Sequence, residues 1–280
     1  IAWPWLWLLV VACATPAQEP ARLPPQAGPI EYSFRYSPEP ETTDITATLG
    51  VVAPSVSTRT NAPEGTFDGT AVHDLYAKSL LTDFDATLVA KGYGVTGTFA
   101  KLDDMTYGEK QRAALVLIPT VTLDVRFQDG APAPYSTVRT QTGQRVGNFT
   151  LHRRTQYAAV PTQVTVNGYI ELVLYEPLSE QKMWVKKIEV PFQSASATYY
   201  RADTQDYYFP TVGDALAGRA RVVSASTETP AQYDGRPNAL AEVLQGAYVP
   251  QLTEFSRYFD PKEIEHVMGE AADARSRARF

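Results

Sequence analysis

Arginines gather in one segment of this chain, whose net charge is otherwise acidic at −6. Between Val125 and Val160 there is one acidic residue, Asp129, against five arginines: Arg126, Arg139, Arg145, Arg153 and Arg154. The planar guanidinium group matches the two oxygens of a carboxylate. The segment is therefore a candidate contact for an acidic sugar or another anionic partner. The alternative is a solvated loop that carries charge for solubility.

A second cluster is aromatic and comprises Tyr199, Tyr200, Tyr207, Tyr208 and Phe209. A tyrosine offers a flat apolar ring with a hydrogen-bonding end, which suits contacts to sugars and to proteins. We therefore consider two roles for the cluster. One is stacking on a bound ligand, and the other is docking a long loop onto the core.

Cys13 is the only cysteine and follows an apolar run that extends from Trp5 to Ala12. Counted from Ile1, the segment up to Ala12 has twelve residues, whereas a helix needs roughly 20 to cross a bilayer. A short run that ends in small residues is typical of a removable signal. Val10-Val11-Ala12-Cys13 matches a bacterial lipobox, so we predict a signal peptide over residues 1–12 and acyl chains, such as palmitate, on Cys13. The alternative is a secretory signal with an incidental cysteine. Neither Met, Lys nor Arg precedes the run, so we expect further residues before Ile1.

The rest of the sequence offers little for catalysis or cofactor binding. Gly92, Gly94 and Gly97 match a G-x-G-x-x-G pattern, but we expect them to close a helix and open a strand. A dinucleotide site needs the opposite order. The three histidines lie far apart, and no nucleophile is paired with a base. We expect no enzyme activity, no cofactor, no metal site and, given the acidic net charge, no nucleic-acid partner.

The scaffold for these side chains is predicted to be a single α+β domain over residues 30–280. Residues 13–29 form a Pro-rich tether after the acylated cysteine. Alternating apolar residues predict strands over 30–36 and 45–51. Spacing at every third or fourth residue predicts one long helix of about 20 residues that ends at Lys91-Gly92.

The later segments complete a mixed, mostly antiparallel sheet of about six strands. Residues 93–99 and 113–127 are predicted strands, and residues 164–175 and 183–192 form a predicted hairpin. Residues 54–69 and 128–162 carry turn and coil signals, and residues 194–233 form a polar, tyrosine-rich segment. Apolar positions between Leu240 and Phe255 predict a C-terminal helix packed on the sheet, and Pro261 begins a last helix.

Several short stretches occur in a familiar order: Cys13 after its apolar run, Tyr32 to Pro38, Ala90 to Val95, and Gly168 to Ser179. In this order the chain resembles the neuraminyllactose-binding haemagglutinin family of bacterial outer-membrane lipoproteins. The resemblance implies a surface or flagellar-sheath lipoprotein that acts as an adhesin for sialylated glycans. The family's sugar-binding stretch corresponds to Arg139-Thr140, and residues 141–144 stand where further lysines are expected.

Two functions follow as hypotheses. The first is a lipid-anchored outer-membrane adhesin that binds a sialylated glycan. Its predicted contacts are Arg139, Thr140, Arg145, Arg153, Arg154, Tyr200 and Tyr207. The second is an envelope scaffold that binds another envelope protein, for secretion, the flagellar sheath or cell-wall machinery, and it is favoured by the missing lysines. Both place the protein on the membrane through Cys13. The sequence does not fix whether the domain faces the periplasm or the cell surface, and an adhesin requires the cell surface.

Overall fold

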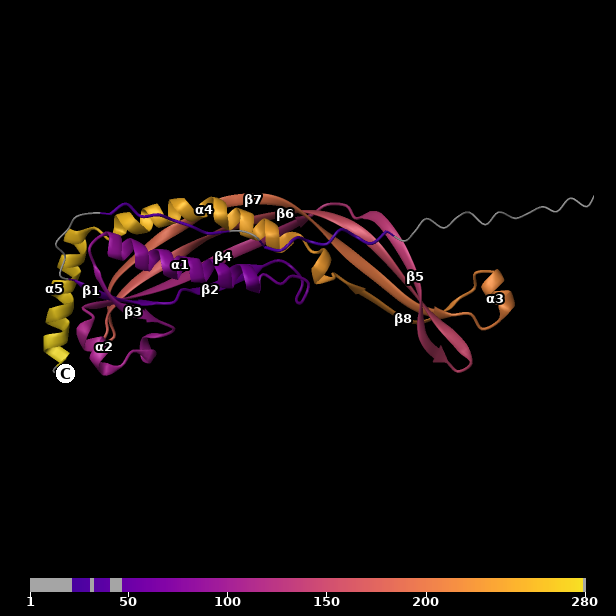
Figure 1. The fold of residues 1–280 in the computed structure, drawn as a ribbon, viewed down its shortest axis with the longest axis horizontal. Helices are drawn as coiled ribbons and strands as arrows, with labels where there is room; N and C mark the ends of the chain where they lie inside the picture. Colours follow the sequence, from indigo (N-terminus) through magenta and orange to yellow (C-terminus); the bar gives the residue numbers. More distant parts are fainter. Residues whose placement is uncertain (1–21, 31–32, 41–46, 279–280) are drawn as a thin grey trace, which may run out of the picture. The chain divides into compact units, whose positions relative to one another are not determined.

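The computed structural model describes residues 22–30, 33–40 and 47–278. Figure 1 shows a sheet of long strands with helices along it. The strands are β1 (Thr48–Val52), β2 (Ser55–Thr60), β3 (Gly94–Phe99), β4 (Leu115–Asp129), β5 (Ala133–Val146), β6 (Phe149–Glu176), β7 (Gln181–Tyr208) and β8 (Arg221–Glu228). The helices are α1 (Thr70–Ala90), α2 (Tyr107–Arg112), α3 (Val212–Leu216), α4 (Arg236–Tyr258) and α5 (Pro261–Ala278).

The strands form one mixed sheet in the order β3-β1-β4-β6-β7-β8, with β2 also paired to β4 and β5 to β6. β1 runs parallel to both β3 and β4, β2 runs parallel to β4, and β4 runs antiparallel to β6. The predicted α+β class, with a mixed sheet and C-terminal helices, is confirmed. The sheet has eight strands among the described residues, rather than about six.

The described residues gather in two compact units. Unit 1 comprises residues 22–24, 135–157 and 203–226, and unit 2 comprises the described parts of 25–134, 158–202 and 227–278. The boundaries predicted for the signal and the tether stay predictions, because residues 1–21 lie outside the described residues. Among the described helices, none combines the length and the apolar character needed to cross a bilayer.

Unit 2 holds the hydrophobic core. Alternation along β4 turns Val121, Leu123 and Val125 inward, where all three are fully buried. Helix α1 packs against this sheet with residues four apart, which lie on one face of a helix. These are Val72, Tyr76, Leu80, Phe84 and Leu88, each with 0% exposure.

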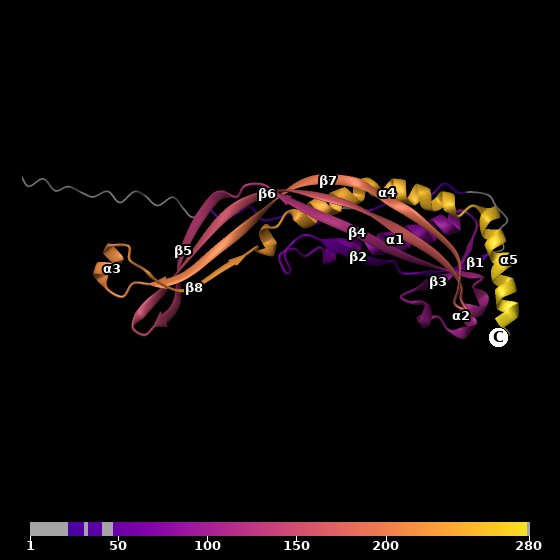
Figure 2. The same ribbon diagram turned by 180° about the vertical axis from the view of Figure 1, so that it is seen from behind.

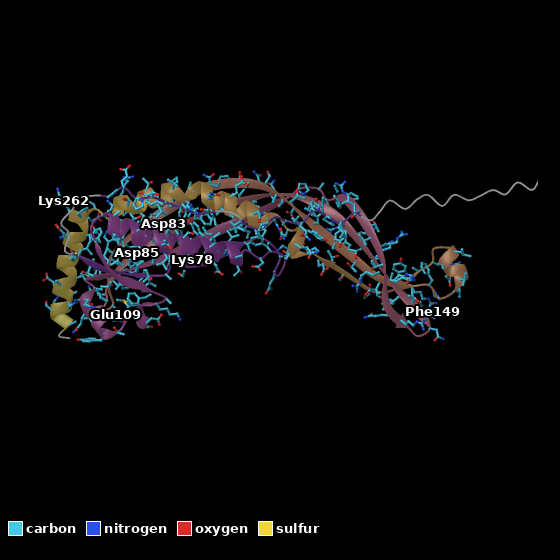
Figure 3. The ribbon with its side chains drawn as sticks, in the orientation of Figure 1. Lys78, Asp83, Asp85, Glu109, Phe149 and Lys262 are labelled. Atoms are coloured by element: carbon cyan, nitrogen blue, oxygen red, sulfur yellow. The ribbon has the colours of Figure 1, made fainter. Side chains whose placement is uncertain are left out.

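Helix α4 lies beside α1, as Figure 2 also shows from the other side. Two tyrosine hydroxyls inside their contact are paired: the Tyr76 hydroxyl donates to Gln251 at 2.5 Å, and the Tyr248 hydroxyl donates to Asp83 at 2.7 Å. Figure 3 labels Asp83 on α1. These bonds satisfy buried polar groups that would otherwise oppose packing.

Unit 1 is built differently. It holds most of β5, the first part of β6, the last part of β7, α3 and most of β8. Pro24 and Leu151 are the buried residues among those described in this unit, and every residue of β8 is exposed. Strand pairing in the order β5-β6-β7-β8 therefore holds this unit together more than an apolar core does.

Three sequence predictions are wrong where the structure describes the residues. Residues 33–36 are not a strand, although Phe34 is buried against Tyr76 and Tyr248. The predicted loop over 54–69 contains β2, and the predicted coil over 128–162 contains β5 and the start of β6. For the polar segment over 194–233 no element was predicted, and it contains the end of β7, then α3 and β8. In each missed strand the stabilising contact is backbone pairing to a neighbour, which leaves little apolar alternation in the sequence.

Other predictions are confirmed. Gly92 closes α1 with a left-handed φ of 89°, and β3 begins at Gly94, so the G-x-G-x-x-G pattern ends a helix. The predicted hairpin is formed by β6 and β7, which extend well beyond its predicted bounds. Helix α5 begins at Pro261, and the Asp260 carboxylate accepts a hydrogen bond from the Lys262 backbone N–H at 3.0 Å.

Candidate functional site

The predicted arginines of β6 lie opposite β7 within unit 1. Arg153 forms a two-pronged ion pair with Asp206, with N–O distances of 2.8 and 2.9 Å. The hydrogen bond from Arg153 lowers the pKa of Asp206 from its ordinary value. The next residue, Arg154, donates instead to the Gln205 amide oxygen at 2.5 Å. Because successive side chains of a strand point to opposite faces, the two arginines belong to different surfaces.

Arg139, Arg154 and Tyr207 line one pocket of unit 1. They come from β5, β6 and β7, and the volume is about 390 Å³, within the usual range of about 300–1,000 Å³ for small-molecule sites. The segment around α3 supplies a further part of the wall. The other lining residues are Gln205, Phe209, Ala215, Gly218, Ala220 and Val222. The structure thus brings together three of the seven predicted glycan contacts.

The pocket favours anions. The described residues that line it include two arginines and no carboxylate. Arg139 is exposed on β5. Arg154 is half-buried, and its Nε atom is buried without a hydrogen-bond partner among the described residues. A buried donor without a partner is costly, and an acceptor from a ligand would relieve that cost.

Tyr207 is held in place by other aromatic rings. Its ring stacks on His152 with a centroid distance of 5.7 Å and meets Phe209 edge-on at 5.5 Å. Such contacts restrict the ring and leave its hydroxyl as a polar end. Phe209 belongs to the predicted aromatic cluster, whereas Gln205 in the lining and His152 beside Tyr207 were not predicted, because no spacing rule links them to the arginines.

The helix that completes the pocket had a sequence signal. Thr211 caps α3 by accepting a hydrogen bond from the Asp214 backbone N–H at 3.0 Å. A threonine followed three residues later by an acid is a common helix start. That pattern could have placed a helix turn after Phe209.

The remaining predicted contacts are not in the pocket. Thr140 and Arg145 are exposed on β5 and do not line it. Arg153 is paired with Asp206, and Tyr200 lies in unit 2, edge-on to Tyr233 at 6.5 Å. Cys13 lies outside the described residues, so its acylation stays a prediction.

Unit 1 is basic. Its described residues hold seven arginines and three aspartates, a net charge of +4 in a chain whose total is −6. The arginines are Arg22, Arg139, Arg145, Arg153, Arg154, Arg219 and Arg221. The sequence predicted this excess only between residues 125 and 160, and Arg126 of that set belongs to unit 2, where it pairs with Asp124 at 2.7 Å.

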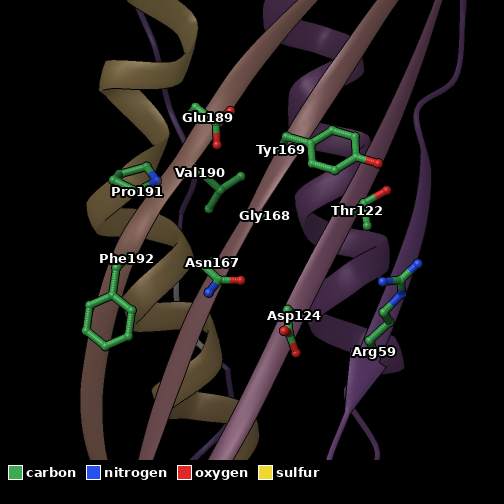
Figure 4. Close-up of a pocket in the computed structure, with 10 residues that line it drawn as sticks. All are labelled: Arg59, Thr122, Asp124, Asn167, Gly168, Tyr169, Glu189, Val190, Pro191 and Phe192. Atoms are coloured by element: carbon green, nitrogen blue, oxygen red, sulfur yellow. The ribbon is translucent and has the colours of Figure 1, made fainter.

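A larger groove of about 500 Å³ lies on the sheet of unit 2. Figure 4 shows its side chains in front of the strands, with helices behind the sheet. Its lining includes Tyr169 and Phe192, and its charged residues are two carboxylates, Asp124 and Glu189, against one arginine, Arg59. The Lys187 ammonium sits 4.4 Å from the centre of the Tyr169 ring. Because carboxylates outnumber arginines here, this groove is a poorer site for an anion than the pocket of unit 1.

A smaller pocket of about 260 Å³ in unit 2 is lined by groups that satisfy one another. The Tyr199 hydroxyl donates to Asp129 at 2.8 Å, and the Tyr199 ring lies 4.1 Å from the Arg236 guanidinium. Burial and this hydrogen bond raise the pKa of Tyr199 to about 12. Arg236 is 3% exposed and pairs with Asp234 at 2.8 Å. These contacts fix the end of the sheet to α4, so we assign them to stability.

The described residues offer no metal-binding cluster. No group of three or more His, Cys, Asp or Glu residues there could hold a metal ion. His73 bonds to Thr58 at 3.1 Å, His152 belongs to the aromatic cluster, and His266 lies 3.5 Å from Glu270 on the surface of α5.

Comparison with known proteins leaves the family open. No family model matches the chain, and none of the curated proteins matches its sequence. A similar solved structure is the crystal structure described as a putative neuraminyllactose-binding hemagglutinin homolog from Helicobacter pylori. It is 15% identical, with a TM-score of 0.47, and the match covers 86% of this chain and 98% of that one. This degree of likeness does not assign the chain to that family.

Proposed function

We propose that the protein is a lipid-anchored binding protein of the bacterial outer membrane, and that the unit 1 pocket binds an acidic sugar such as a sialylated glycan. The observation that carries the proposal is the convergence of Arg139, Arg154 and Tyr207 on a pocket of suitable volume. Two guanidinium groups would hold the carboxylate, and the tyrosine would contact the sugar ring and a hydroxyl group. The function is binding, without a chemical step.

The anchor in this proposal rests on the sequence. An acylated Cys13 would hold the protein on the membrane, and two or more acyl chains bind stably where one binds only marginally. Within the predicted tether, the Arg22 guanidinium lies 5.9 Å from the Tyr135 ring of unit 1.

The direct test is calorimetric titration of the chain with a free sialylated oligosaccharide. A charge-assisted hydrogen bond contributes about 1.5–3 kcal/mol, so Arg139→Ala or Arg154→Ala should weaken binding roughly 10- to 150-fold. Arg145→Ala removes the same charge outside the pocket and is the matched control. Absence of binding at millimolar oligosaccharide, or equal losses in all three variants, would reject the pocket as the site.

One observation favours the scaffold as a second candidate. Strand β8 is the last strand of its sheet and exposes two apolar side chains, Val222 at 58% and Val223 at 51%. Such an edge can pair with a strand of another protein. A scaffold would retain no glycan, and its partner binding would depend on Val223 rather than on Arg139.

A further inference from the structure

Helix α3 carries apolar side chains that point into solvent. Val212 is 79% exposed and Leu216 is 86% exposed, the highest values among the large apolar side chains of the described residues. They stand four residues apart and so share one side of the helix. Figures 1 and 2 both show α3 on a loop that protrudes beyond the ends of β7 and β8. Two large apolar residues on a protruding loop are unfavourable in water unless something covers them.

The same segment forms part of the candidate pocket. Ala215 of α3, and Gly218 and Ala220 after it, line the cavity beside Arg139 and Arg154. The apolar protrusion and the anion site therefore belong to one structural element. A ligand with an acidic group attached to an apolar body would satisfy both.

The charge around α3 identifies the kind of surface that would cover it. Arg219 and Arg221 follow the helix and are exposed, and unit 1 carries a net charge of +4. Asp214 offsets part of this charge by pairing with Arg219 at 3.1 Å. Basic side chains around a short apolar insertion are the features that bind proteins to lipid surfaces with anionic headgroups. Because α3 has only five residues, it offers a protein partner little of the area that a stable interface needs.

We infer that the acidic ligand of unit 1 is carried by a membrane lipid: the pocket holds the acidic headgroup while Val212 and Leu216 enter the apolar edge of the bilayer. This inference rests on the proposed acidic-sugar site and narrows its ligand from acidic glycans in general to acidic glycolipids. Burying the two side chains adds affinity that a free oligosaccharide cannot provide.

The test compares the affinity of the protein for one sialylated headgroup on a lipid in a vesicle and for the same headgroup as a free oligosaccharide. The chain carrying Cys13→Ser is mixed with phosphatidylcholine vesicles that contain a monosialylated glycosphingolipid, and separately with the free oligosaccharide of that lipid. All variants share this background, so the N-terminal segment contributes equally to each. We expect the vesicles to bind at least about tenfold more tightly than the oligosaccharide.

Variants separate the two parts of the site. Val212→Ser/Leu216→Ser should weaken vesicle binding at least about tenfold and leave oligosaccharide binding unchanged, whereas Arg139→Ala should weaken both. Val249→Ser removes an apolar side chain of 51% exposure from α4 and is the matched control. A further control uses vesicles in which phosphatidylglycerol replaces the glycolipid. These vesicles carry negative charge without the sugar headgroup and should bind weakly.

Three outcomes overturn the inference. One is equal affinity for vesicles and for the oligosaccharide, and another is vesicle binding that the Val212→Ser/Leu216→Ser variant does not weaken. Either would show that α3 does not contact the bilayer when the sugar binds. Equal binding to phosphatidylglycerol vesicles would show that net charge acts without the headgroup pocket. Loss of binding to every ligand, the free oligosaccharide included, would be the separate failure of the proposed function itself.

Discussion

Arg153 and Arg154 are consecutive in the chain, yet their side chains serve opposite faces of β6. Arg153 is neutralised by Asp206, which also accepts a hydrogen bond from the Ser224 hydroxyl at 3.2 Å. Arg154 bonds to an uncharged amide and keeps its full positive charge in the pocket wall. Of the two consecutive arginines, Arg153 therefore forms a structural ion pair and Arg154 is a candidate ligand contact.

This division gives a prediction for binding. Arg154→Ala should weaken acidic-sugar binding roughly 10- to 150-fold, whereas Arg153→Ala should change it less than about twofold, because an exposed ion pair contributes little. Binding to the wild-type chain should also weaken as salt rises, since exposed charges are screened within about 8–10 Å. Calorimetry at two salt concentrations measures both effects, and a larger loss in Arg153→Ala would contradict the assignment of faces.

The lipid anchor gives a second prediction. Cys13→Ser should abolish acylation and either release the protein from the membrane fraction or block its processing, because the thiol is the acceptor of the lipid. Fractionation of cells and mass spectrometry of the intact protein measure the two results. Wild-type protein that is cleaved without acylation would instead indicate an ordinary secretory signal.

Core packing gives a third prediction. Leu117 of β4 and Leu244 of α4 are both fully buried, as the sequence pattern predicted. Replacing either with alanine should cost about 2–5 kcal/mol in the free energy of unfolding. Leu216→Ala, at 86% exposure, is the control and should change stability by less than about 0.5 kcal/mol. Urea denaturation measures the free energy of unfolding of all three variants. Similar values for the three would contradict the burial of Leu117 and Leu244 in the core.

Gly168 gives a fourth prediction. Its φ is 155°, and a Cβ atom at this position would lie 2.0 Å from the Thr122 carbonyl oxygen across the β4–β6 pair. Gly168→Ala must displace one of the two strands and should destabilise the protein by about 1–3 kcal/mol. Gly246 on the exposed side of α4 has open space around it. Gly246→Ala should be stabilising by up to about 1 kcal/mol, and the opposite ranking of the two melting temperatures would refute this account.

Glu176 gives a prediction with a pH dependence. Its carboxylate is fully buried and pairs with Arg275 at 2.7 Å. Burial raises the pKa of Glu176, but hydrogen bonds from Ser179, Arg275 and Leu178 together outweigh burial and hold the pKa below its ordinary value. A lowered folded-state pKa stabilises the protein above the unfolded-state pKa, and this stabilisation is lost as pH falls through the folded-state value.

The corresponding variants are Glu176→Gln and Arg275→Met. The stability difference between wild type and Glu176→Gln should be largest at neutral pH and should shrink below about pH 4. Arg275→Met at pH 7 should cost about 2–4 kcal/mol, less than for a fully buried pair because Arg275 is 31% exposed. Arg257→Met on the exposed side of α4 is the control. A stability loss in Glu176→Gln that grows toward low pH would contradict a lowered pKa of Glu176 in the folded protein.

The sequence by itself determined most of unit 2. Helix α1, the cap at Gly92, β4, the central hairpin and the C-terminal helices were predictable because each buries a regular apolar face. Phe34 is an exception: its alternating neighbours suggested a strand, but the residue fills the gap between Tyr76 and Tyr248 from an irregular segment. Alternation shows that a side chain is buried, and tertiary contacts decide whether its backbone also pairs.

Unit 1 and its pocket were decided by tertiary structure. β5 and β8 bury almost nothing, so their strand pairing leaves no periodic apolar signal. The sequence identified a basic segment and a tyrosine cluster, but it could not tell which residues would meet. Alternation along β6 separates Arg154 from Arg153, and the register of β6 against β7 places Arg154 beside Gln205 on the pocket face that Tyr207 shares. The register is fixed by backbone hydrogen bonds between the strands, which nearly every residue type can make. The residue types of β6 and β7 therefore do not predict their register.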